Sequence, residues 1–156
     1  MSDFILKLLI EGFFAGASSI GFGMVFNVPK EALKFCALGG AIAIITRTIL
    51  LDIGFGIELS TFISATFIGI IALYWSRKHL VPRPVYTVAS IIPMIPGTYA
   101  FTAMISLVDM NTHGVTEHLI GLFVFNGLKA VSILGAISFG LALPSLYFIR
   151  LNRPVI

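Results

Sequence analysis

A lysine lies inside a long apolar run near the end of the sequence. Lys129 comes ten residues after Leu119, where the run begins, or about 15 Å along a helix that rises about 1.5 Å per residue. If the run crosses a membrane, burying this charge costs at least about 2.5–3.5 kcal/mol, so the ammonium must face an anion or water. Asn126 lies three residues earlier on the same helix face. The pair is suited to bind a carboxylate, although a structural ion pair would also account for Lys129.

A second unusual feature is a segment with two prolines and a glycine inside another apolar run. It reads Pro93-Met94-Ile95-Pro96-Gly97-Thr98-Tyr99. A proline removes one backbone donor and clashes with the carbonyl four residues earlier. Pro93 therefore frees the carbonyl of Ala89, and Pro96 frees that of Ile92. The segment predicts a broken helix, in which the amides after Gly97 attract carboxylates and the freed carbonyls attract cations. A passive structural kink is the alternative.

The break and the lysine lie at similar expected depths. Pro96 is about twelve residues into its apolar run and Lys129 about ten into its own, so both fall near the middle of a hydrocarbon layer about 30 Å thick. Together they offer backbone amides, an amide side chain and an ammonium to a small carboxylate. The predicted substrate-binding residues here are Lys129, Asn126, Pro93, Pro96, Gly97, Thr98 and Tyr99.

Three other charged residues lie within or beside apolar runs: Lys7, Glu11 and Arg47. Arg47 is four residues from the expected end of its helix, where it either reaches the interface or binds a carboxylate of the substrate. Lys7 is close to a helix end and can also extend to the interface. Glu11 follows Lys7 by four residues, so the two either pair or leave Glu11 as a protonatable group for proton coupling.

The sequence lacks the residues that several kinds of catalysis and cofactor binding require. No Gly-rich loop of the G-x-x-x-x-G-K-[ST] type is present to hydrolyse ATP. His79, His113 and His118 lie in predicted loops, so none is placed to activate a nucleophile within the membrane. Cys36 is the single cysteine, which excludes a multi-cysteine metal site. We therefore predict no enzyme activity, no cofactor, no metal and no nucleic-acid partner.

The candidate binding residues can act as described only if the helices that carry them cross a bilayer. The 156 residues are 58% hydrophobic and 11% charged, whereas soluble domains carry roughly a quarter charged residues, so lipid must be the main solvent. A spanning helix needs about 20 apolar residues, and five stretches are long enough. We predict an all-α membrane protein with a single transmembrane domain over residues 1–156. The expected helices are 4–26, 33–51, 57–75, 85–108 and 119–149, of which the fourth is broken at Pro93–Gly97 and the fifth either tilts or ends near Pro144.

Lysine and arginine residues alternate between the two sides of this arrangement. They lie in or beside the first and third loops and in the C-terminal tail, whereas the second and fourth loops contain acidic residues and no lysine or arginine. Loops rich in lysine and arginine face the cytoplasm. We therefore expect the N-terminus outside and the C-terminus in the cytoplasm. The basic residues are Lys30, Lys34, Arg77, Lys78, Arg83, Arg150 and Arg153, and the acidic residues are Asp52, Asp109 and Glu117.

Small residues recur at helical spacing in the first and the last segment. They are Gly12, Gly16, Ser19 and Gly23 in the first, and Ser132, Ala136 and Gly140 after Lys129 in the last. Small residues let membrane helices approach closely. We expect both stripes to lie at helix contacts.

Four motifs occur in order along the chain. They are Gly21-Phe22-Gly23-Met24-Val25-Phe26-Asn27-Val28-Pro29, Pro93-Met94-Ile95-Pro96-Gly97-Thr98-Tyr99-Ala100, Asn126-Gly127-Leu128-Lys129-Ala130 and Gly140-Leu141-Ala142-Leu143-Pro144. Together with Arg47, they resemble the end of the first helix, the Pro-x-x-Pro-Gly signature and the last helix of the small subunit of split threonine/serine exporters. The resemblance covers nearly the whole chain.

The resemblance implies a five-helix subunit of a secondary exporter in the bacterial inner (cytoplasmic) membrane. It implies a larger five-helix partner subunit and a small carboxylate substrate, either threonine or serine or a dicarboxylate such as succinate. Two five-helix halves inserted in opposite senses would form an inverted repeat with the substrate at their interface. The alternative function is a non-transporting scaffold that stabilises a partner. A homo-oligomeric channel is disfavoured by the family's need for a partner.

Overall fold

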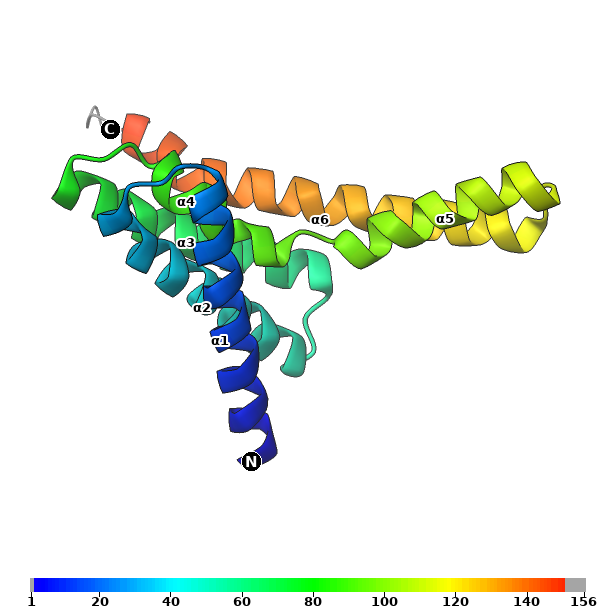
Figure 1. Cartoon of the computed structure of the whole chain (residues 1–156), viewed down its shortest axis with the longest axis horizontal. Helices are drawn as coiled ribbons and strands as arrows, with labels where there is room; N and C mark the ends of the chain where they lie inside the picture. Colours follow the sequence, from blue (N-terminus) through cyan, green and yellow to red (C-terminus); the bar gives the residue numbers. More distant parts are fainter. Residues whose placement is uncertain (1, 151–156) are drawn as a thin grey trace. The chain divides into compact units, whose positions relative to one another are not determined.

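The computed structural model describes the backbone of residues 2–150 and the side chains of residues 3–147, so Arg153 and the side chain of Arg150 lie outside the described part. All regular structure in the described residues is helical, which confirms the all-α prediction for this part of the chain. The elements are α1 (Ser2–Val25), α2 (Lys30–Asp52), α3 (Ile57–His79), α4 (Pro84–Ile91), the 3-10 helix η1 (Ile92–Met94), α5 (Gly97–His113) and α6 (Glu117–Arg150) (Figure 1).

The helices extend beyond the apolar runs and take in polar residues at their ends. α2 begins at Lys30, and its first turn contains Glu31, which interacts favourably with the positive end of the helix dipole. α3 continues to His79, so Arg77 and Lys78 lie in its last turn rather than in the predicted loop. Cations are favoured at that end of a helix. Helical hydrogen bonding therefore continues past the apolar run at the start of α2 and at the end of α3.

The prediction that the three histidines lie in loops is wrong. His79 and His113 are the last residues of α3 and α5, and His118 lies in the first turn of α6. The acidic residues expected in loops are also helical, for the same reason: a polar side chain at a helix end reaches water while its backbone keeps helical hydrogen bonds. These residues are Asp52 in α2, Asp109 in α5 and Glu117 in α6.

Four described helices, α1, α2, α3 and α6, are long and apolar enough to cross a membrane. A fifth span results if α4, η1 and α5 count as one interrupted segment, which agrees with the predicted break in the fourth helix. α6 has 34 residues, or about 50 Å of helix, and continues through Pro144 instead of ending there. This is longer than a hydrocarbon layer of about 30 Å, and a helix accommodates such an excess by tilting or kinking or by local thickening of the bilayer. The expected sides of the two termini stay a prediction.

The helices form two compact units, and each is described by itself. The first comprises residues 2–94 and α6 from Ala136 onward, and the second comprises Ile95–Gly135, which contains α5 and the first part of α6. In the second unit α5 and α6 are joined at Gly114, whose φ of 92° favours glycine. The single transmembrane domain proposed for residues 1–156 stays a prediction.

In the first unit the small-residue face of α1 packs against α2. A Cβ atom on Gly16 would lie 3.2 Å from the carbonyl oxygen of Ala37. A Cβ atom on Gly40 of α2 would lie 3.1 Å from the carbonyl oxygen of Ala15. The two backbones therefore approach as closely as the stripe of small residues in α1 predicts.

The C-terminal part of α6 packs against α3 in the same unit. A Cβ atom on Gly140 would lie 2.7 Å from the carbonyl oxygen of Phe62 and 2.9 Å from the Cβ of Ala65. At the next residue of α6, the carbonyl of Leu141 accepts a hydrogen bond from Arg83 Nη2. Burial lowers the pKa of the Arg83 guanidinium from its usual value, because removal from water disfavours the charged form.

We expect Gly140→Ala to destabilise the protein by about 1–3 kcal/mol, because the added methyl group would overlap the α3 backbone at Phe62. Gly135→Ala on the same helix is the matched control, since its methyl group would have no heavy atom within 4 Å beyond the backbone of its own helix and alanine favours helix. Unfolding in detergent mixtures, followed by circular dichroism, compares the two variants. Equal stability would contradict the close approach of α6 to α3.

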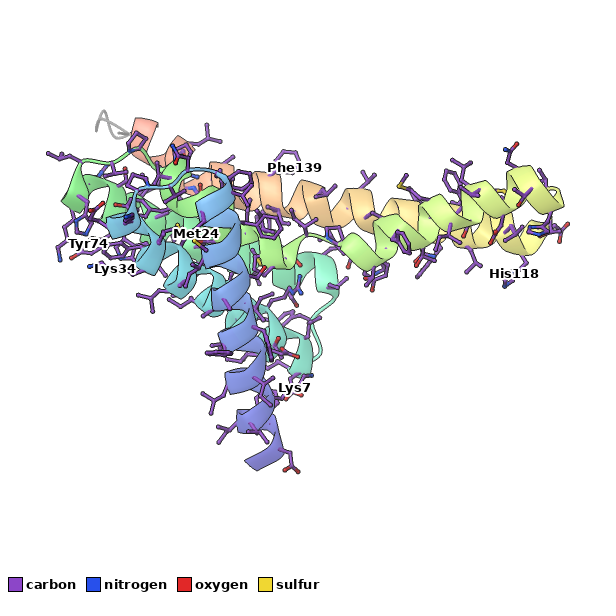
Figure 2. The ribbon with its side chains drawn as sticks, in the orientation of Figure 1. Lys7, Met24, Lys34, Tyr74, His118 and Phe139 are labelled. Carbon is purple, nitrogen blue, oxygen red and sulfur yellow. The ribbon has the colours of Figure 1, made fainter. Side chains whose placement is uncertain are left out.

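Large apolar side chains cover the outside of the first unit. Met24, Tyr74 and Phe139, labelled in Figure 2, are 61%, 63% and 72% exposed. By contrast, Ser60 and Ser64 of α3 are fully buried. Large apolar side chains exposed in this way indicate a membrane or protein contact, and small polar residues at helix interfaces are typical of membrane proteins.

Candidate functional site

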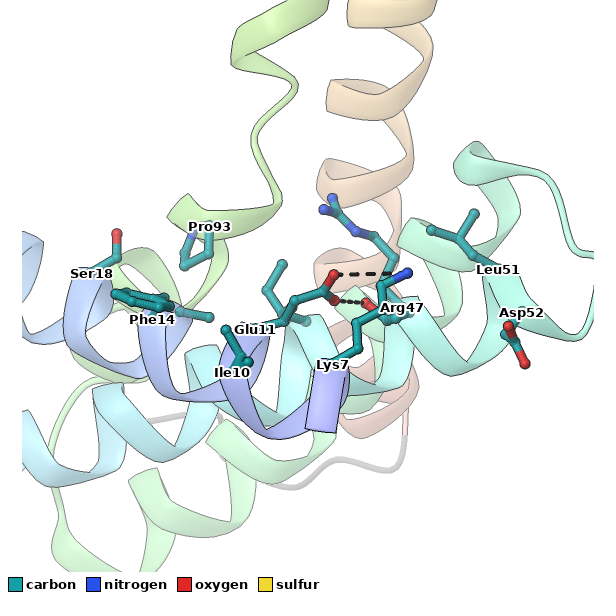
Figure 3. Close-up of a pocket in the computed structure, with 12 residues that line it drawn as sticks. Lys7, Ile10, Glu11, Phe14, Ser18, Arg47, Leu51, Asp52 and Pro93 are labelled. Carbon is teal, nitrogen blue, oxygen red and sulfur yellow. Dashed lines mark hydrogen bonds and ion pairs between the residues drawn. The ribbon is translucent and has the colours of Figure 1, made fainter. Parts of the chain in front are cut away.

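A cavity of about 630 Å³ is lined by α1, α2 and Pro93 of η1 in the first unit. Figure 3 shows this cavity with its lining residues. Its volume falls in the range of about 300–1,000 Å³ that is usual for small-molecule sites. Its charged and hydroxyl-bearing residues are Lys7, Glu11, Ser18, Arg47, Thr48 and Asp52. Both signs of charge thus face one space.

Glu11 has a partner at each carboxylate oxygen. Its Oε2 accepts a hydrogen bond of 2.6 Å from the Thr48 hydroxyl of α2. Its Oε1 lies 3.9 Å from Lys7 Nζ, one helical turn earlier on α1. The expected pairing of Lys7 with Glu11 is confirmed, although 3.9 Å is too long for a direct hydrogen bond. A proton-coupling role for Glu11 stays a prediction.

Arg47 contacts the helix interruption. Its Nη1 donates a hydrogen bond of 3.1 Å to the carbonyl of Met94, the last residue of η1. A guanidinium therefore hydrogen-bonds a backbone carbonyl at the break, as expected where the protein must satisfy carbonyls that have no helical partner. The sequence identified Ala89 and Ile92 as the carbonyls freed by proline and did not identify Met94. Carboxylate binding by Arg47 stays a prediction.

The fourth segment is interrupted as predicted. α4 ends at Ile91, one 3-10 turn follows, and α5 begins at Gly97. Pro96 has φ −79° and ψ 58°, and the Gly97 N–H donates to the carbonyl of Ile95 at 2.8 Å. These values describe an inverse γ-turn. Because Pro96 has no N–H and its ψ is not helical, the hydrogen-bond ladder stops there.

In the second unit the first turn of α5 contains Thr98 and Tyr99. Amides in the first turn of a helix have no acceptor within the helix and attract anions. Gly97 and Thr98 are exposed and Tyr99 is half-buried. The location of these amides at a helix N-terminus agrees with the prediction, and substrate binding by them stays a prediction.

The polar residues of α6 lie in the same unit as the start of α5. Asn126 is buried and its Nδ2 donates to the carbonyl of Leu122 at 2.8 Å. Lys129 is half-buried and Ser132 is exposed. The predicted site residues therefore divide between the units: Pro93 and Arg47 line the cavity of the first, and Pro96, Gly97, Thr98, Tyr99, Asn126 and Lys129 belong to the second.

Sequence reasoning did not identify three polar residues that line the cavity: Ser18, Thr48 and Asp52. Thr48 and Glu11 are 37 residues apart, so no local spacing connects them. The available signal was the position of Thr48 directly after Arg47 in an apolar helix. Among the described residues, no group of three or more histidine, cysteine, aspartate and glutamate side chains is arranged to hold a metal ion.

The apolar helices and the polar cavity between them define a multi-pass helical membrane protein. A family model described as "Threonine/Serine exporter, ThrE" matches residues 11–147. The chain belongs to the threonine/serine exporter family, which confirms the resemblance found in the sequence. Membership in a family of transporters agrees with the expectation that the chain is not an enzyme.

An uncharacterized protein of Haemophilus influenzae is 44% identical over 153 residues, which cover 98% of this chain and 51% of the relative. The chain thus spans about half the length of this curated relative. No solved structure matches the chain.

Proposed function

We propose that the chain is one subunit of a secondary exporter of a small carboxylate metabolite in the bacterial inner membrane. Its family is the first support. The observation that carries the proposal is the contact of Arg47 with Met94 at a helix interruption, beside a cavity that Glu11 also lines. Interrupted helices supply ion and substrate sites in secondary transporters because they present unbonded backbone groups within the membrane.

The proposed partner is a larger membrane subunit that carries a second five-helix half. The Haemophilus influenzae relative supports this, because the chain corresponds to about half of its length. Two halves of opposite orientation would form an inverted repeat, with the transported molecule bound between them. The exposed apolar surface of the first unit leaves ample area for both lipid and such a partner.

The substrate is proposed to be threonine or serine, or a dicarboxylate such as succinate. Lys129, with Asn126, would bind a carboxylate together with the amides that follow Gly97. In the first unit, Arg47 would bind a carboxylate at the cavity that it lines with Glu11. Glu11 is the candidate for proton coupling, because an ionisable carboxylate within a spanning helix is a common proton carrier.

Proteoliposomes containing both subunits test the proposal. We expect them to exchange radiolabelled threonine, serine or succinate, and we expect either subunit alone to exchange none, because the site would need both halves. Vesicles with each subunit alone are the controls. If the paired subunits transport none of the three substrates, the proposal is contradicted.

A non-transporting scaffold is the second candidate, and one set of observations favours it. Glu11, Asn126 and Arg47 each make at least one hydrogen bond within the chain. Internal pairing of this kind is what a purely structural subunit requires, because it satisfies polar groups without a ligand.

Cysteine accessibility separates the two candidates. In the assembled pair, we expect cysteines at Thr98 and Ser132 to react with a membrane-impermeant thiol reagent, because both would face a water-filled path. Phe139→Cys on α6 is the control: that position is 72% exposed on the apolar surface, where lipid excludes the reagent. Native Cys36 is fully buried and provides a low background. Equal protection of all three introduced cysteines would favour the scaffold.

A further inference from the structure

The two oxygens of the Glu11 carboxylate have different surroundings. Oε2 is fixed by the Thr48 hydroxyl at 2.6 Å, and Thr48 is buried on α2. A charge-assisted hydrogen bond of this length orients the carboxylate. Oε1 faces Lys7 Nζ at 3.9 Å. One oxygen therefore anchors the group, while the other is available for closer contact with a cation.

The Lys7 ammonium is a loose partner. Its side chain is 59% exposed, against 36% for Glu11, and 3.9 Å is beyond hydrogen-bond distance. Exposed ion pairs at this helical spacing contribute little stability, because water competes for both charges. A ligand cation that reaches Oε1 at hydrogen-bond distance would make a stronger contact than the Lys7 contact that it replaces.

The cavity around Glu11 has room for such a cation. Its volume of about 630 Å³ greatly exceeds that of one water, about 30 Å³. Phe14 and Ile10 line the same space as Glu11 and offer apolar contacts to the carbon atoms of a ligand. Arg47, from α2, adds a positive charge that suits an anionic group on the same ligand.

We propose that Glu11, held by Thr48, is a binding subsite for the ammonium group of a small amine, and that Lys7 occupies it when no ligand is bound. This rests on the proposed function and deepens it. A ligand with both an ammonium and a carboxylate matches Glu11 and Arg47 at once, whereas a dicarboxylate places a like charge against Glu11. Lys7 is then a tethered competitor, which leaves the subsite when the ligand's own ammonium enters.

A proton and an ammonium also exclude each other at this carboxylate, because only the ionised form binds a cation. The charged groups that line the cavity with Glu11 are Lys7 from α1 and Arg47 and Asp52 from α2; η1 contributes Pro93, which does not titrate. Exchange of a proton for an ammonium at one group gives a physical basis for antiport, and it connects the subsite to the coupling role proposed for Glu11.

Binding measurements test the subsite directly. Calorimetric titration of the chain in lipid nanodiscs, alone and with the larger subunit, uses L-threonine and ethanolamine as ammonium-bearing probes and N-acetylthreonine and succinate as probes without an ammonium. We expect Glu11→Gln to weaken binding of the first two by about tenfold or more, the effect of one charge-assisted hydrogen bond. Lys7→Met should tighten their binding about two- to fivefold by removing the competitor.

Two variants serve as controls. Lys34→Met removes an exposed positive charge of α2 outside this cavity and should bind the probes like the wild type. Glu31→Gln removes an exposed carboxylate of α2 outside this cavity and should have little effect. Unchanged thermal melting of each variant shows that folding is retained.

The subsite would be overturned by wild-type affinity in Glu11→Gln, by weaker binding in Lys7→Met, or by absence of ammonium-dependent binding in every preparation. Transport by the paired subunits is scored separately. Amine binding that depends on Glu11 without any transport would contradict the exporter function and leave the subsite intact. Transport of succinate but not of threonine or serine, without amine binding, would contradict the subsite and leave the exporter function intact.

Discussion

Replacing Lys129 with alanine is expected to lower transport by the paired subunits by about 10²-fold. Loss of one partner from a buried charge pair costs about 2–5 kcal/mol, and the half-buried Lys129 is proposed to bind the substrate carboxylate within α6. Initial rates of radiolabelled exchange in proteoliposomes provide the measurement. Lys129→Arg should retain part of the activity, because it keeps the charge but changes its geometry.

The control for this substitution is Lys78→Ala, which removes an exposed positive charge from the last turn of α3. We expect that variant to exchange substrate at the wild-type rate. If Lys129→Ala and Lys129→Arg both transport like the wild type, then Lys129 does not belong to the site. Equal expression and melting of the variants distinguish lost binding from lost folding.

Replacing Arg47 with alanine is expected to reduce both transport and stability. The substitution removes the charge-assisted hydrogen bond to the Met94 carbonyl, which contributes about 1.5–3 kcal/mol. It also releases the backbone at the interruption, and a displacement of about 1 Å in a binding site lowers rates by about 10²-fold. Exchange assays and detergent unfolding measure the two effects on the same preparation.

Lys30→Ala is the control for Arg47, because Lys30 is the exposed first residue of the same helix. Arg47→Lys separates charge from geometry, since an ammonium lacks the planar fork of a guanidinium. We expect it to recover stability only in part. Wild-type melting and exchange in Arg47→Ala would show that the contact with Met94 is incidental.

The interruption of the fourth segment was predictable from sequence because its cause is covalent. Pro93 and Pro96 lack backbone donors wherever they occur, so two of them three residues apart favour an interruption of the helix. The γ-turn at Pro96 and the start of α5 at Gly97 are the local result. The helix ends were less predictable. An apolar run indicates which residues contact lipid, whereas a helix ends where its backbone hydrogen bonds end. Arg77 and Lys78 were for that reason expected in a loop and lie in α3.

The candidate cavity was less predictable than the break. The pairing of Lys7 with Glu11 follows from helical spacing, and the structure contains it. The bond from Thr48 to Glu11 and the bond from Arg47 to Met94 join residues 37 and 47 positions apart. Such pairs depend on how α1, α2 and η1 pack, and a single sequence carries no spacing rule for them.

The sequence by itself determined that lipid is the main solvent, that the chain is helical and that the fourth segment is interrupted near its two prolines. Hydrophobicity and proline chemistry act locally, so they can be read without the tertiary structure. Its motifs also determined the family, which the comparison over residues 11–147 confirms. Only the tertiary structure decided that Glu11, Thr48 and Arg47 line one cavity. The small residues between α1 and α2 allow the close approach that brings these side chains together, and that convergence requires packing in three dimensions.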